Sequence, residues 1–150
     1  MLEHLYDRDF YAWTQQQARL LRGHKLSELD ITNLAEEIEA MGRSEKRELA
    51  SRLEILLMHL LKWQFQPNLR SRNWQLTIQE QRLRLEQHLS ENPSLKALLP
   101  DYLEGAYPLA TLSAERETGL NGFPEVCPYT VDQIFDSTFL PGSRPGDGAL

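Results

Sequence analysis

The chain has 150 residues, of which 41% are hydrophobic and 25% are charged, an ordinary composition for one globular domain. No apolar run approaches the roughly 18 residues that a membrane span needs, and the first residues lack the pattern of a secretory signal. The sequence therefore predicts a cytoplasmic protein with no membrane contact. The single cysteine, Cys127, excludes an intrachain disulfide and a multi-thiolate zinc site.

Charge is unevenly distributed along the chain. Residues 1–42 carry a net charge of -4, residues 43–90 carry +4, and residues 91–150 carry -6. This pattern predicts either that the segments neutralise one another within the fold or that the middle presents a positive surface to an anionic partner. We favour the first, because solvated helix faces absorb most asymmetries of this size.

Helix signals begin near the N-terminus. Asp7 is a candidate N-cap for a helix over 8–22 that closes at Gly23. Asp30 is the candidate cap of a short second helix, which we expect to end at Gly42 because glycine adopts a left-handed C-terminal turn most readily.

A third helix is predicted from Ser44, and its pattern runs without a breaker to Pro67. Helical spacing places a core-facing stripe on one side of it, comprising Leu49, Ala50, Leu53, Leu56, Leu57, Leu60 and Leu61. The opposite side carries Ile55, Met58 and Phe65. Apolar residues on two sides are typical of the central helix of a bundle.

Further helices follow toward the C-terminus. A fourth is predicted over 72–90, a short turn at 95–99, and a longer helix over 101–118 that is bent or broken at Pro108. Thr130 with Gln133 forms a capping-box pattern that opens a small helix.

No strand alternation of useful length and no fixed repeat occurs, so the predicted fold class is all-α. We expect a single-domain helical bundle of about five to six helices over 5–141, with a long central helix. Residues 142–150 are rich in Pro, Gly and Ser and are predicted to be a disordered tail.

The residues offer little catalytic chemistry. The four histidines lack the spacing of a helical metal site, no Glu-x-x-His motif accompanies the glutamates, and no glycine-rich phosphate loop is present, so no metal and no cofactor is predicted. Glu48, Arg52 and His59 share a polar strip of the third helix. His59 is either a partly buried histidine bonded to a neighbouring helix or a general base, and we favour the former.

The most distinctive segment is the turn between the third and fourth helices. It supplies the candidate binding residues Lys62, Arg70, Arg72 and Trp74, and Arg82 extends them along the fourth helix. Guanidinium and indole groups suit an anionic, planar ligand. Alternatively, Trp63 and Trp74 pack the corner between the two helices while the arginines pair with acidic segments.

Several motifs resemble those of the bacterial domain-of-unknown-function family twenty-nine. They are Tyr6–Trp13, Gly42–Arg47, His59–Gln64, Arg70–Trp74 and Phe123–Tyr129, and together they cover about residues 5–141. The resemblance implies an all-helical bacterial protein of the cytosol and implies no activity, ligand or catalytic residue. The family often has Trp where this chain has Tyr129.

These observations favour a binding module whose basic turn contacts an acidic protein segment. A small enzyme is the alternative, with His59 as general base or ligand and Arg52 orienting an anionic substrate. A nucleic-acid-associated protein is a further alternative, although such modules are usually basic overall and this chain is acidic. A homo-oligomer that buries the second apolar face of the third helix is compatible with each of these.

Overall fold

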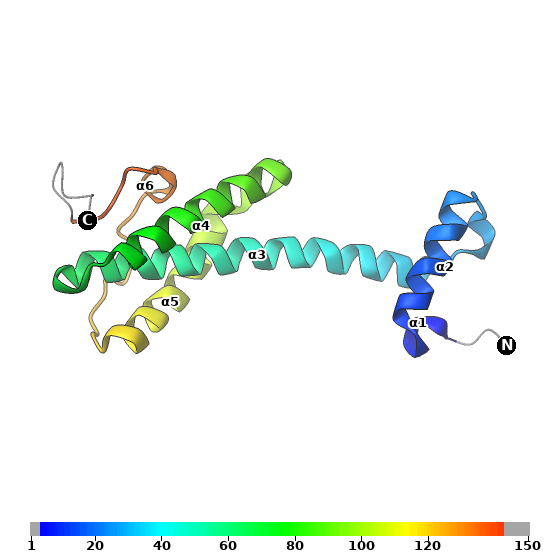
Figure 1. Cartoon of the computed structure of the whole chain (residues 1–150), viewed down its shortest axis with the longest axis horizontal. Helices are drawn as coiled ribbons and strands as arrows, with labels where there is room; N and C mark the ends of the chain where they lie inside the picture. The colour runs from blue at the N-terminus through cyan, green and yellow to red at the C-terminus, as the bar shows by residue number, and fades with distance from the viewer. Residues whose placement is uncertain (1–3, 143–150) are drawn as a thin grey trace. The chain divides into compact units, whose positions relative to one another are not determined.

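The computed structural model describes residues 4–142, within which every regular element is helical. The α-helices, shown in Figure 1, are α1 (Leu5–Arg8), α2 (Phe10–Arg22), α3 (Ile31–Phe65), α4 (Arg72–Glu91), α5 (Leu99–Thr118) and α6 (Val131–Phe135). Short 3-10 helices lie at Leu26–Glu28, Pro67–Leu69 and Pro93–Leu98. The all-α prediction is confirmed. None of the helices in this part of the chain has the length and apolar character needed to cross a bilayer.

The predicted start of the first helix at Asp7 is wrong. Asp7 lies inside α1, and Asp9 separates α1 from α2 with an extended backbone (φ -150°, ψ 87°). The Asp9 carboxylate accepts a hydrogen bond from the backbone N–H of Ala12 at 3.0 Å. Asp9 is therefore the residue that satisfies the free N–H groups at the start of α2.

The predicted break at Gly42 is also wrong, because α3 is one helix of 35 residues. Gly42 keeps the helical conformation, whereas Gly119 ends α5 in the left-handed region with φ +75°. A glycine inside a helix costs only about 1 kcal/mol relative to alanine, which good helix formers on either side can offset. Ser44 accordingly starts no helix of its own.

Contacts divide the chain into two compact units, Met1–Glu45 and Lys46–Leu150. In the first unit the indole of Trp13 is buried and donates to the Asp30 carboxylate at 2.9 Å. Gln17 accepts a hydrogen bond from the backbone N–H of Asp30, also at 2.9 Å. Asp30 thus begins α3 as predicted and ties it to α2.

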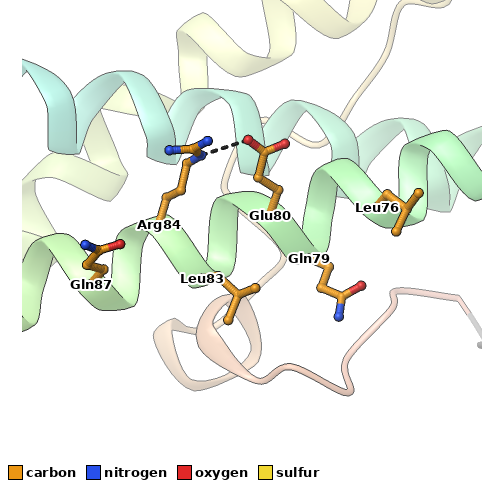
Figure 2. A pocket seen from close by; sticks show the side chains of 6 residues that line it. All are labelled: Leu76, Gln79, Glu80, Leu83, Arg84 and Gln87. Carbon is orange, nitrogen blue, oxygen red and sulfur yellow. Dashed lines mark hydrogen bonds and ion pairs between the residues drawn. The ribbon is translucent and has the colours of Figure 1, made fainter.

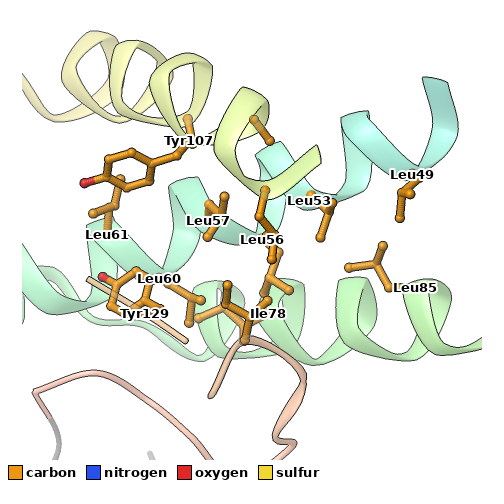
Figure 3. Close-up of a cluster of buried hydrophobic side chains, with 14 of the residues drawn as sticks. Leu49, Leu53, Leu56, Leu57, Leu60, Leu61, Ile78, Leu85, Tyr107 and Tyr129 are labelled. Carbon is orange, nitrogen blue, oxygen red and sulfur yellow. The ribbon is translucent and has the colours of Figure 1, made fainter. Parts of the chain in front are cut away.

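The second unit contains the main hydrophobic core, in which α4 and α5 pack against residues 46–65 of α3 (Figure 3). Six leucines of the predicted stripe are fully buried there: Leu49, Leu53, Leu56, Leu57, Leu60 and Leu61. Met58 and Phe65, on the opposite side, are partly buried against the same core. The central helix therefore has neighbours on two sides, as its pattern predicts.

The remaining predicted features lie in the second half of the chain. Pro108 neither breaks nor ends α5, which continues to Thr118. Thr130 and Gln133 form the predicted capping box of α6, with both reciprocal hydrogen bonds present. The extent of the helical domain, 5–141, stays a prediction, and residues 143–150 of the predicted tail lie outside the described residues.

Candidate functional site

The outer face of α4 carries the groove that we take as the candidate binding site. Ser71 caps this helix by accepting a hydrogen bond from the backbone N–H of Trp74 at 3.1 Å. Spacings of three and four residues then bring one set of side chains to a common face. The outer face consists of Leu76, Gln79, Glu80, Leu83, Arg84 and Gln87, which line a shallow groove of about 390 Å³ (Figure 2).

Two exposed leucines give the outer face of α4 its apolar character. Leu76 and Leu83 lie two helical turns apart, and Leu83 is 61% exposed. Arg84 and Glu80 form an ion pair at 2.7 Å beside them. Arg72, one turn before Leu76, is exposed and donates to the side-chain oxygen of Gln75 at 2.9 Å. The face therefore combines two exposed leucines with polar side chains and an exposed arginine at one end.

The predicted binding residue Lys62 lies inside the protein. Only 6% of it is exposed, and its Nζ atom is 3.1 Å from a carboxylate oxygen of Glu117 on α5. The same ammonium lies 4.7 Å from the ring centroid of Trp74. Lys62 is thus neutralised within the fold, and Trp74 is half-buried beneath it.

Arg70 is used in a similar way at the corner between α3 and α4. Its Nε donates to the carbonyl oxygen of Trp63 at 2.8 Å, and its guanidinium lies 5.1 Å from the Trp63 ring centroid. Trp63 itself is fully buried. This tryptophan therefore packs the corner and offers no platform for a ligand.

Arg82 is buried, with 5% of its surface exposed. Its Nε donates to the carbonyl oxygen of Ile134 at 2.8 Å, and a terminal nitrogen donates to that of Gln133 at 3.1 Å. Burial lowers the pKa of Arg82 to about 10, and the nearby Asp136 acts in the opposite direction. Arg82 thus satisfies carbonyls at the end of α6 and does not reach the surface.

The predicted basic residues consequently form no common surface patch. Lys62 and Arg82 are buried, Arg70 is half-buried, and Arg72 is exposed. The Lys62–Glu117 pair fits the expectation that oppositely charged segments neutralise one another inside the fold. Arg72 is accordingly the one of these cations that is open to a partner.

A second polar site lies between α3 and α4, and the predicted polar strip contributes Glu48 and Arg52 to it. Arg52 donates to the Glu48 carboxylate at 3.0 Å and to the side-chain oxygen of Gln81 at 3.3 Å. The buried ring of His88 places Nδ1 3.5 Å from the same carboxylate. Glu48, Arg52 and His88 line part of a cavity of about 160 Å³.

The hydrogen bond from Arg52 is the main cause of a lowered pKa at Glu48. Among the described residues, no buried side-chain N or O atom lacks a hydrogen-bond partner. The side chains of Glu48, Arg52, Gln81 and His88 therefore form one polar network between α3 and α4 through these contacts. The spacing of seven residues between Gln81 and His88 was the available sequence signal.

His59 does not join this network, although the sequence places it on one strip with Glu48 and Arg52. Its Nδ1 lies 2.9 Å from the carbonyl oxygen of Ile55, one turn earlier in α3. Burial lowers the pKa of His59, and the backbone hydrogen bond acts in the opposite direction. The ring is therefore bonded to its own helix, and the predicted bond to a neighbouring helix is wrong.

Comparison with known proteins identifies the family. The profile described as Domain of unknown function DUF29 matches residues 5–140. The chain belongs to this family. Comparison with curated proteins and with solved structures gives no match. The DUF29 match spans every helix from α1 to α6, so the family pattern includes both the outer face of α4 and the first half of α3.

Proposed function

We propose that this DUF29 protein is an interaction module that binds a helical segment of a partner protein through the outer face of α4. The observation that supports this is the pair of exposed leucines, Leu76 and Leu83, which line one groove. Exposed apolar side chains in a groove with a polar rim are typical of protein-binding sites.

The chemistry of the face indicates an acidic amphipathic helix as the partner. Apolar residues seven apart on such a helix would pack on Leu76 and Leu83, while a carboxylate near its end would pair with Arg72. Of the basic residues predicted from the sequence, Arg72 binds the partner in this proposal, and Lys62, Arg70 and Arg82 hold the surrounding structure in place.

The proposal includes a bacterial source and a cytoplasmic location. The resemblance of this chain's motifs to those of a bacterial family supports the source. The single cysteine offers no intrachain disulfide, which suits a reducing compartment.

The proposal is tested by affinity capture of the tagged chain from a lysate of its source organism, with and without nuclease. We expect a stoichiometric protein that resists nuclease, whose capture falls at least about tenfold for Leu83→Glu, a loss of about 1.4 kcal/mol. Leu109→Glu is the matched control, because Leu109 is an exposed leucine on α5. The captured protein is then purified, and its affinity for the same three chains is measured directly.

Two results would contradict the proposal. If the wild type and Leu83→Glu bound the captured protein with equal affinity, the outer face of α4 would not be the binding site. A partner that is lost on nuclease treatment, with binding that falls steeply as salt is added, would indicate nucleic-acid binding instead.

A further inference from the structure

The first half of α3 presents an apolar stripe that nothing in its own unit covers. The open stripe consists of Ile31, Leu34, Ile38 and Met41, spaced by three, four and three residues. Ile31 and Met41 are 62% exposed and Ile38 is 61% exposed, whereas Leu34 is half-buried. This spacing is that of a coiled-coil seam, in which each apolar residue inserts between residues of a facing helix.

The other contacts of the first unit lie on a different side of the same helix. Tyr6 donates a hydrogen bond to the Glu37 carboxylate, and Trp13 donates to Asp30. Helical spacing places Glu37 and Asp30 on one flank of the open stripe and the small residues Ala35 and Gly42 on the other. Since α1 and α2 are attached through the first flank, the stripe and its small-residue flank stay open.

The first unit has little core of its own. Between residues 4 and 45, the buried side chains are Trp13 and Gln17. Units of this size rarely bury enough apolar surface to be stable without a staple or a partner. An exposed apolar stripe on a unit with so small a core therefore indicates a surface that pairs with another helix.

We propose that the open stripe pairs with the same stripe of a second copy of this chain, as an antiparallel helix pair whose two-fold axis crosses the stripe midway between Leu34 and Ile38. The charges favour a copy over a strongly charged partner. The four side chains of the stripe are apolar and uncharged, and their spacing of three, four and three residues is the same in either direction along the helix. An uncharged face is compatible with itself, as a two-fold interface requires.

The antiparallel direction follows from residue order and from the helix dipole. It places Leu34 opposite Ile38 of the partner subunit, and Ile31 opposite Met41 of the partner subunit. Ala35 lies beside the axis, where a small side chain allows two helices to approach closely. Antiparallel helices also place the positive end of each dipole beside the negative end of the other.

This interface uses a different unit from the outer face of α4, so it does not depend on the proposed function.

The mass of the full chain in solution tests the pairing, by sedimentation equilibrium over a range of concentrations. We expect the wild type to be a dimer and Ile38→Glu to raise the dimer dissociation constant at least about 100-fold, because both copies carry the buried charge. Leu83→Glu is the matched control, since Leu83 and Ile38 are both 61% exposed. Circular dichroism checks that both variants keep the helical content of the wild type.

The direction of the helices is tested by disulfide trapping in a Cys127→Ser background. A chain with Ile31→Cys is mixed with a size-tagged chain carrying Met41→Cys and is oxidised slowly. We expect the mixed disulfide to exceed either self-pair, because antiparallel pairing brings these two positions together.

Three results would overturn the inference. The first is a wild-type chain that stays monomeric at about 100 μM, a concentration at which a 10 μM interface is mostly formed. The second is a dimer that is dissociated by Leu83→Glu but not by Ile38→Glu, since it would use the outer face of α4. The third is a predominance of self-pairs in the trapping experiment, which would indicate parallel helices.

Discussion

The two halves of α3 carry similar residues at similar spacing but meet opposite environments. In residues 46–65, Leu53 and Leu56 are fully buried beneath α4 and α5 (Figure 3). In residues 31–45, Ile31 and Ile38 are more than half exposed. Full burial of such a side chain contributes about 1.5–3 kcal/mol to the stability of the fold. The same pattern therefore stabilises the fold in one half and leaves an exposed apolar surface in the other. Helical periodicity identifies a face that can be buried, and the neighbouring elements decide whether it is.

The largest expected effect on stability comes from removing a buried side chain of residues 46–65. Leu56→Ala should lower the free energy of unfolding by about 3 kcal/mol, because it removes buried methyl groups and leaves a cavity. Ile38→Ala, at a protein concentration too low for pairing, should change it by less than about 0.5 kcal/mol. Urea denaturation followed by circular dichroism measures both. Equal losses would show that the two halves do not differ as described.

The next effect concerns the segment that helps to enclose the second half. Arg82→Met removes both hydrogen bonds to the end of α6 and leaves a buried carbonyl unsatisfied, which we expect to cost about 2 kcal/mol. Arg84→Met is the matched control, because Arg84 is exposed and its ion pair with Glu80 contributes less than about 1 kcal/mol. Hydrogen exchange at the amides of α6 should accelerate for the first variant alone.

A smaller effect of opposite sign is expected at the junction of the two halves. Gly42→Ala should raise the stability of the single chain by about 0.5–1 kcal/mol, since alanine is the better helix former and a Cβ there meets no atom within 4 Å. Gly119→Ala should lower it by about 1 kcal/mol, because the left-handed conformation at φ +75° disfavours a side chain. Thermal denaturation of dilute protein would refute this if both variants shifted in the same direction.

The smallest effect is the pH dependence of stability that we expect from His59 in the second half of α3, since residues 31–45 contain no histidine. The folded-state pKa of His59 lies below its ordinary value of 6.5 owing to burial. The unfolded chain therefore binds the proton more readily, and the free energy of unfolding falls as pH drops through 6.5 toward the lowered pKa. His59→Gln should flatten this part of the profile, measured as the urea midpoint across a pH series. An unchanged slope would assign the dependence to other groups.

Local sequence signals predicted the elements whose structure is determined locally. The leucine stripe from Leu49 to Leu61 is buried, and Thr130 caps α6 through side chains only three residues away. Gly42 misled the prediction because glycine permits a helix end without requiring one, and no competing cap forms at Ser44. Asp7 and Asp9 are equally good caps by residue type, and only the backbone of Asp9 leaves the helical region.

The candidate site was harder to predict because burial of long polar side chains depends on distant partners. Lys62 is neutralised by Glu117, 55 residues later, and Arg82 binds the carbonyl oxygen of Ile134, 52 residues later. Neither separation leaves a periodic signal in the sequence. Arg72 is exposed and donates to the side-chain oxygen of Gln75, three residues later in the same helix.

The loop between α5 and α6 contains the single cysteine of the chain, Cys127. Its Sγ lies 3.6 Å from the carbonyl oxygen of Tyr129, and burial raises the pKa of the thiol. Alkylating reagents attack the thiolate, so the raised pKa slows reaction at neutral pH, and an opening of the loop that further exposes the thiol speeds it. The rate at which iodoacetamide labels Cys127 therefore reports how often this loop opens. The measurement needs no substitution, because the chain has no other cysteine.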